Sequence, residues 1–142
     1  ESAVTRVEFV KLPRPEKAQV LCDLAEEFYL KGRRVLVMVQ DENQGLTLDK
    51  FMWVWKKGSF VPHAHDNGAV DCHDEPVVIV DEEANPNGAD TLILGTPCSL
   101  DFLRHFSHVV DFAETHDEKC REESRQRFRS YQENGFGPYL RE

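Results

Sequence analysis

The sequence predicts an α/β fold, a three-layer sandwich in which helices cover a mainly parallel sheet of about five strands. Short apolar runs alternate along the chain with longer amphipathic stretches, which is the order expected of strands and helices in this class. Several runs are almost continuously apolar, as in strands covered on both faces. A chain of 142 residues is also the size of one domain, so residues 1–142 are expected to form a single unit.

The first half of the chain predicts two strands and two helices. Residues 5–12 alternate in part between polar and apolar and are followed by a proline, which favours a strand. Residues 16–31 place apolar side chains at the spacing of one helix face, and Gly32 is a typical helix end. The apolar run over 33–40 predicts a covered strand, and a second amphipathic helix is expected from residue 41 or 42 to 55.

The second half begins with a loop over residues 56–75 that is rich in His, Asp, Gly and Pro. Two further core strands are then predicted by apolar runs, with strong turn residues between them. A short amphipathic helix, a fifth strand and a charged closing helix complete the pattern. The expected ranges are strands 76–80 and 91–94, helix 99–106, strand 107–113 and helix 117 to about 134.

Composition limits the classes of function. The chain has 17 Lys and Arg against 26 Asp and Glu, a formal net charge of −9, which argues against a surface that wraps nucleic acid. No apolar run reaches the roughly 20 residues of a membrane span and no signal peptide is recognised, so a cytoplasmic protein without membrane contact is expected. The cysteines lack CxxC spacing and are expected to be free thiols: Cys22, Cys72, Cys98 and Cys120.

The turn after the first strand bears on cofactor binding. In many folds of this class a glycine-rich turn at this point binds phosphate at a helix N-terminus. Here the turn reads KLPRPEK and contains no glycine. We therefore expect a Rossmann-like fold without a phosphate-binding loop, with no cofactor, no small-molecule substrate and no catalytic residue.

Histidines gather in the loop after the second helix. His63, His65 and His73 lie close to Cys72 in the sequence, and imidazole and thiolate are zinc ligands. The spacing matches no closed four-ligand pattern, and a polar surface loop is the favoured interpretation, so no metal is predicted. A small metal-binding protein or enzyme that uses His63, His65 and His73 remains the alternative.

Trp53 does not fit the core face of its helix. At 100° per residue, Leu48, Phe51, Met52 and Trp55 form one stripe and Trp53 lies roughly opposite. Either the following loop covers the indole, or the indole is an anchor for a partner protein, in which case Phe60 and Pro62 extend the same patch. Both interpretations stay open at this point.

The closing helix carries a basic stripe on an acidic chain. Arg121, Arg125, Phe128 and Arg129 stand at i, i+4, i+7 and i+8, so they share one face. A solvated face with local ion pairs is the ordinary interpretation. The functional one is a docking site for an acidic segment with an apolar side chain, since Arg pairs with carboxylates and its stem packs on apolar groups.

Several segments together resemble one protein family. They are KAQVLCDLAEEFYLKGRRVLV at 17–37, DENQ at 41–44, Trp53 followed by SFVPH at 59–63, VVDF at 109–112 and RQRFRSYQENGF at 125–136. Over nearly the whole chain this pattern is similar to the chi subunit of bacterial DNA polymerase III, an accessory protein of the clamp loader. The similarity is loose only between residues 64 and 90.

The resemblance implies a nucleotide-binding-like fold without that activity, and two protein partners. The psi subunit, which tethers chi to the clamp loader, would bind Trp53, Phe60 and Pro62. The acidic C-terminal tail of single-stranded DNA-binding protein, which ends in Pro-Phe, would bind the basic stripe. Arg125 would be the central charge partner and Phe128 would take a place usually held by Tyr. The resemblance thus implies a non-catalytic adaptor that contacts DNA indirectly and serves a DNA-directed DNA polymerase, a nucleotidyltransferase.

Overall fold

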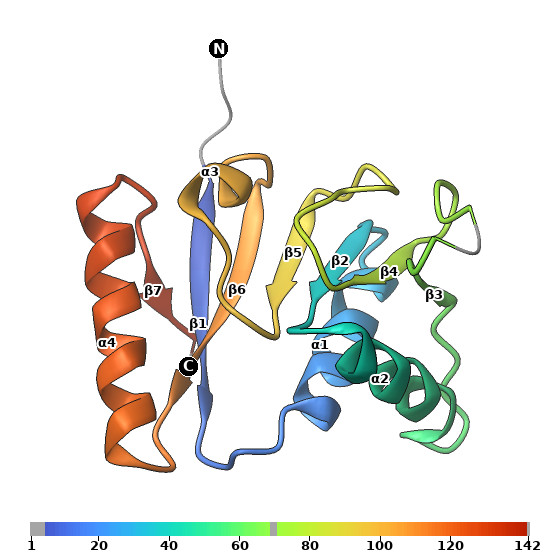
Figure 1. Cartoon of the computed structure of the whole chain (residues 1–142), viewed down its shortest axis with the longest axis horizontal. Coiled ribbons are helices and arrows are strands. Elements are labelled where there is room, and N and C mark those ends of the chain that lie inside the picture. The colour runs from blue at the N-terminus through green and yellow to red at the C-terminus, as the bar shows by residue number, and fades with distance from the viewer. Residues whose placement is uncertain (1–4, 69–70, 142) are drawn as a thin grey trace.

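The computed structural model describes residues 5–68 and 71–141, which form a parallel seven-stranded sheet flanked by helices (Figure 1). The strand order is β3-β4-β2-β5-β6-β1-β7, and every pairing is parallel. The elements are β1 (Arg6–Leu12), α1 (Ala18–Leu30), β2 (Val35–Met38), α2 (Glu42–Val54), β3 (His63–His65), β4 (Val77–Val80), β5 (Thr91–Leu94), α3 (Leu100–Leu103), β6 (His108–Glu114), α4 (Glu118–Glu133) and β7 (Tyr139–Leu140).

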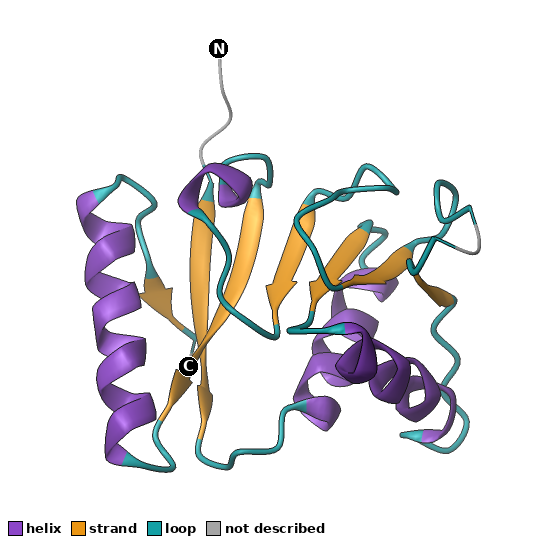
Figure 2. Ribbon diagram, in the orientation of Figure 1, coloured by secondary structure: helices purple, strands orange, loops and turns teal. Residues whose placement is uncertain are grey.

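The strands send alternate side chains into two cores. In β2, Val35 and Val37 pack with α1 and α2, whereas Leu36 and Met38 pack on the opposite face with residues of α3 and α4. Figure 2 shows α4 standing apart from the α1 and α2 pair, with the strands between them. Because both faces of the central strands are covered, all four residues of β2, β4 and β5 are buried. The predicted three-layer α/β sandwich is confirmed.

Local sequence signals determine where the helices begin and end. Asp41 and Asp117 cap α2 and α4, each accepting a hydrogen bond from a first-turn backbone N–H at 2.8 Å. Gly32 and Gly135 follow α1 and α4 with φ of 80° and 83°, the left-handed conformation that glycine adopts at helix ends. No helix in the described ranges is long and apolar enough to cross a membrane.

The strand count differs from the expected five, because two short edge strands were missed. β3 lies inside the segment expected to be a loop over residues 56–75, and β7 lies near the chain end. Their three and two residues carry too little alternation to be recognised as strands. They form because β4 and β1 offer unpaired edges for backbone hydrogen bonding.

None of the four cysteines forms a disulfide, as predicted. Burial raises the pKa of the Cys22 and Cys98 thiols to about 12. Such thiols stay protonated at neutral pH and behave as small apolar side chains.

Candidate protein-binding surfaces

A buried ion pair fixes the orientation of α4 on the sheet. The Arg127 guanidinium donates to both carboxylate oxygens of Asp111 in β6, at 2.9 and 3.2 Å, and the Tyr131 hydroxyl donates to the same carboxylate at 2.7 Å. Burial raises the pKa of the Tyr131 hydroxyl, and the charge of Asp111 raises it further. With Arg127 and Tyr131 directed at the sheet, the helix turns Arg121 and Arg125 outward.

A cavity of about 360 Å³ opens beside this outward face. Its apolar part joins three elements: Phe9 of β1, Phe128 of α4 and Leu140 of β7. The rings of Phe9 and Phe128 have centroids 5.1 Å apart, and Leu140 lies opposite Phe9 in the β1–β7 pairing. This α4 cavity, as it is termed below, is lined by Phe9, Ala113, Glu114, Thr115, Arg121, Ser124, Arg125, Phe128 and Leu140.

Two guanidinium groups border the α4 cavity. Arg121 donates to the Thr115 carbonyl oxygen at 3.2 Å and lies 3.5 Å from a carboxylate oxygen of Glu118. Arg125 has a side chain 57% exposed and lies 3.7 Å from a carboxylate oxygen of Glu122. Exposed pairs of this kind contribute about 0–1 kcal/mol, so they compete only weakly with an external carboxylate.

The structure brings together three of the four residues of the predicted basic stripe. Arg121, Arg125 and Phe128 all line the α4 cavity, whereas Arg129 is exposed on the same helix and does not line it. Phe9 and Leu140 also line this surface, and they were not predicted from the sequence. They are brought there by strand pairing across more than a hundred residues of sequence, and no local pattern marks them.

A salt-bridge cluster holds β7 in place and so positions Leu140. Arg141, the next residue, donates two hydrogen bonds to Glu27 of α1, at 2.9 and 2.8 Å, and also bonds Glu8 of β1. His108 contacts the same Glu8 carboxylate at 2.9 Å. The hydrogen bonds from Arg141 lower the pKa of Glu27. Burial alone would raise the pKa of Glu8, but the hydrogen bonds and charges of Arg141 and His108 together lower it.

Trp53 lies at the other edge of the sheet. Its indole is 53% exposed and Phe60 is 64% exposed, and their ring centroids are 5.7 Å apart. On its inner side the indole packs on His63 of β3, with centroids 4.6 Å apart. The following loop therefore contacts Trp53 without covering it, and together with the half-buried Pro62 these residues form what we term the Trp53 patch.

Hydrogen bonds anchor the loop that carries Phe60 of the Trp53 patch. Glu26 of α1 accepts hydrogen bonds from Ser59 at 2.5 Å and Lys56 at 3.0 Å, which ties the loop before Phe60 to α1 and lowers the pKa of Glu26. The fully buried His63 ring contacts the Val61 carbonyl oxygen at 2.7 Å and Asp49 of α2 at 3.0 Å. Phe60 is thus presented by a loop anchored at both ends.

His63, His65 and His73, the candidate metal ligands of the loop, lie in three different environments. Both ring nitrogens of His63 face protein oxygens. His65 is buried with its ring against Gly45, where an added Cβ would lie 2.3 Å from Nε2. His73 is exposed and contacts Asp74. Within residues 5–68 and 71–141, the side chains that gather at metal-ligand spacing are instead Glu114, His116 and Cys120.

Comparison with known proteins places the chain beside one family. Residues 4–138 match the family model described as "DNA polymerase III chi subunit, HolC". The DNA polymerase III subunit chi of Escherichia coli is 32% identical over 119 residues, 83% of this chain and 80% of that protein. The subunit chi of Pseudomonas aeruginosa is 31% identical over 136 residues, 94% of this chain and 93% of that protein.

A solved structure shares the fold at low sequence identity. The crystal structure of T4 UvsW superposes with a TM-score of 0.69 and 10% identity, over 98% of this chain and 41% of that protein. At this identity the similarity concerns only the arrangement of strands and helices.

Proposed function

The chain belongs to the DNA polymerase III chi subunit family, accessory proteins of DNA replication, and on this premise we propose that it is an adaptor with two partners. One partner is the psi subunit, through which it joins the clamp loader. The other is the acidic C-terminal tail of single-stranded DNA-binding protein. The adaptor brings the polymerase holoenzyme to DNA that this protein coats, and its own contact with DNA is indirect.

The observation that carries the proposal is the composition of the α4 cavity. An apolar pocket formed by Phe9, Phe128 and Leu140 suits the terminal phenylalanine of the tail, while Arg121 and Arg125 at its border suit the acidic residues before it. The molecule as a whole is acidic, with a net charge of −9. Nucleic acid is repelled by this background, so the cavity selects an acidic peptide by local charge and a ring contact.

The Trp53 patch is the proposed psi-binding surface. Exposed, rigidly held aromatic side chains are typical anchors of protein interfaces, and Trp53 and Phe60 are exposed on an anchored base. Trp53 packs on β3 and the α4 cavity includes β7, and these are the two opposite edges of the sheet. Two partners therefore have room to bind at once.

Titration with a synthetic tail peptide tests the α4 cavity. Arg125→Ala should weaken binding at least about 10-fold, because a hydrogen bond to a charged group is worth roughly 1.5–3 kcal/mol. Wild-type binding should also weaken as salt is raised. Arg129→Ala should have a smaller effect, because Arg129 does not line the cavity. Calorimetry or fluorescence anisotropy measures each affinity.

The matched control is Lys50→Ala, which removes one positive charge from an exposed position on α2. It should bind the peptide as the wild type does. If Arg125→Ala binds as tightly as Lys50→Ala, the α4 cavity is not the binding site of the tail.

A further inference from the structure

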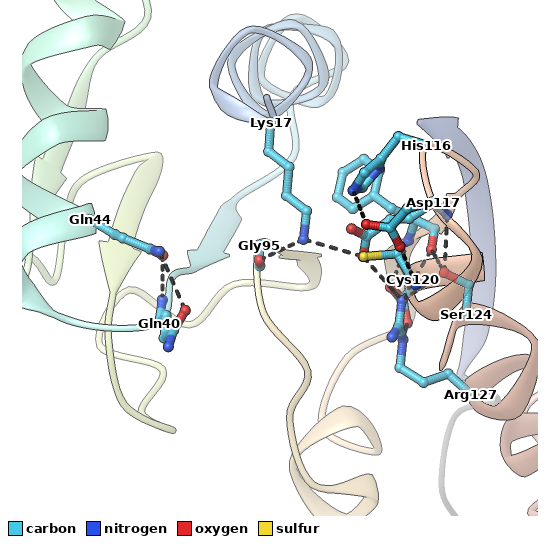
Figure 3. A network of polar contacts seen from close by, with 12 residues as sticks. Lys17, Gln40, Gln44, Gly95, His116, Asp117, Cys120, Ser124 and Arg127 are labelled. Atoms are coloured by element: carbon cyan, nitrogen blue, oxygen red, sulfur yellow. Dashed lines mark hydrogen bonds and ion pairs between the residues drawn. The ribbon is translucent and has the colours of Figure 1, made fainter. Parts of the chain in front are cut away.

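A second polar cluster lies where β6 leads into α4. Glu114 ends β6, His116 lies in the connecting turn and Cys120 is in the first turn of α4. One ligand atom from each side chain lies within 4.8 Å of the other two. Figure 3 shows His116 and Cys120 together at the start of α4, near Lys17. Imidazole, thiolate and carboxylate are the three ligand types that zinc binds in proteins.

His116 has a nitrogen that no protein group satisfies. Its side chain is only 16% exposed, and Nδ1 is buried without a hydrogen-bond partner among the described residues. Nε2 lies 3.8 Å from a carboxylate oxygen of Asp117, which is longer than a hydrogen bond. A buried polar atom without a partner is unfavourable, and a metal ion would satisfy it.

The ion pairs of Glu114 use only one of its two carboxylate oxygens. Its ion pairs with Lys17 and Arg127, at 3.5 and 3.6 Å, both use Oε2. Both are longer than the 2.7–2.9 Å typical of a charge-assisted hydrogen bond. Lys17 is also held by the Gly95 carbonyl oxygen at 3.1 Å (Figure 3). The carboxylate can therefore offer Oε1 to a cation while Oε2 retains its present partners.

The surroundings of Cys120 favour a cation. The carboxylates of Asp117, Glu114 and Glu123 lie close enough to the thiol to act on it through their negative charge. The same carboxylates attract a divalent ion, whose charge stabilises the thiolate as a ligand. Magnesium and calcium prefer all-oxygen sites, whereas sulfur with nitrogen favours zinc.

We propose that Glu114, His116 and Cys120 bind a zinc ion, with one coordination position left open. The site shares Glu114 with the α4 cavity but requires no protein partner, so the proposal does not depend on the proposed function. Glu114 lines both the α4 cavity and a neighbouring cavity of about 440 Å³, which His116 also lines. A bound ion would thus add positive charge beside the surface proposed to receive an acidic tail.

Cobalt titration tests the site, because Co²⁺ takes the place of Zn²⁺ and reports its ligands by absorbance. Untagged protein kept reduced without thiols should bind one Co²⁺, with a thiolate-to-metal charge-transfer band, and Zn²⁺ should displace it. Cys120→Ser should lose that band. His116→Gln should weaken binding by more than about 100-fold, since even residues that only support a ligand change metal affinity 10–100-fold.

The matched controls are Cys98→Ser and His105→Gln, which change the same residue types outside the cluster. Both should bind Co²⁺ as the wild type does, and circular dichroism should show all four variants folded. If the wild type gives no thiolate band, or if Cys120→Ser or His116→Gln binds as the wild type does, the proposal is wrong. It is equally wrong if binding is lost on changing His63 or His73 instead.

Discussion

Arginines on the same helix have different roles, and the difference follows from their position around the helix axis. Arg125 and Arg127 are two residues apart, which is 200° of rotation, so they face opposite sides. Arg127 is 18% exposed and bonded to Asp111, whereas Arg125 is 57% exposed with one long ion pair. The first holds the helix to the sheet, and the second is available to a partner.

Replacement of these two arginines should separate stability from binding. Arg127→Met should lower the free energy of unfolding by about 3 kcal/mol, because it leaves the buried Asp111 carboxylate without its charge partner. Arg125→Ala should change it by less than about 0.5 kcal/mol, as is usual for exposed positions. Urea unfolding measures both. Equal losses of stability in the two variants would contradict the division of roles.

The burial or exposure of a single residue was predictable where it depends on helix geometry alone. The 100° rotation per residue placed Trp53 away from the stripe of Leu48 and Met52, and these two are buried while Trp53 is exposed. Geometry could not say whether the loop would cover the indole, because that depends on the anchoring of the loop by Glu26. Helix geometry also could not place Glu114, His116 and Cys120 together. Their proximity depends on how the end of β6, the connecting turn and the start of α4 are arranged in space.

At the scale of elements, β7 shows how a two-residue strand can shape a surface. It adds Leu140 to the α4 cavity and is held by the backbone N–H of Arg141, which donates to the Phe9 carbonyl oxygen at 2.8 Å. The side chain of Arg141 then bridges Glu8 and Glu27. The chain end is thereby joined to both β1 and α1.

This cluster should make stability depend on pH. The pKa values of Glu8 and Glu27 are lower in the folded protein than in the unfolded chain, so their contribution is complete at neutral pH. It is lost as pH falls below about 4.5 and through the lowered pKa values. Arg141→Gln should be less stable than wild type by roughly 1–3 kcal/mol at pH 7, and the difference should narrow in acid.

Urea unfolding of the wild type and Arg141→Gln, from pH 7 down to about pH 3, measures this difference. Lys57→Gln, which removes a charge from an exposed loop position, is the control and should change little at any pH. A difference between wild type and Arg141→Gln that stays constant with pH would show that the carboxylates are not responsible.

The helices and the core strands were predictable from sequence, and the two short edge strands were not. Helices α1, α2 and α4 each span three turns or more, enough for periodicity and caps to agree. The strands β2 and β4 are continuous apolar runs, and β5 is apolar after Thr91. β3 and β7 owe their conformation to the neighbouring edge strand rather than to their own residues, so local sequence could not reveal them.

For the whole molecule, the two proposed surfaces lie at opposite edges of one sheet. The Trp53 patch adjoins β3, and the α4 cavity adjoins β7. Each partner would therefore bind without approaching the other, as an adaptor requires. The net charge of −9 keeps the background surface unfavourable for DNA, so under the proposed function recruitment would depend on the coating protein rather than on the strand.

The most direct test of this account is a bridging measurement. Single-stranded DNA coated with single-stranded DNA-binding protein is immobilised, and retention of labelled psi is measured with and without the present protein. Psi should be retained only when the present protein is added. Arg125→Ala should abolish retention by releasing the adaptor from the coated strand, and Trp53→Ala should leave the adaptor bound but lose psi. Retention of psi on DNA coated with a form that lacks the acidic tail, or undiminished retention with both variants, would contradict the account.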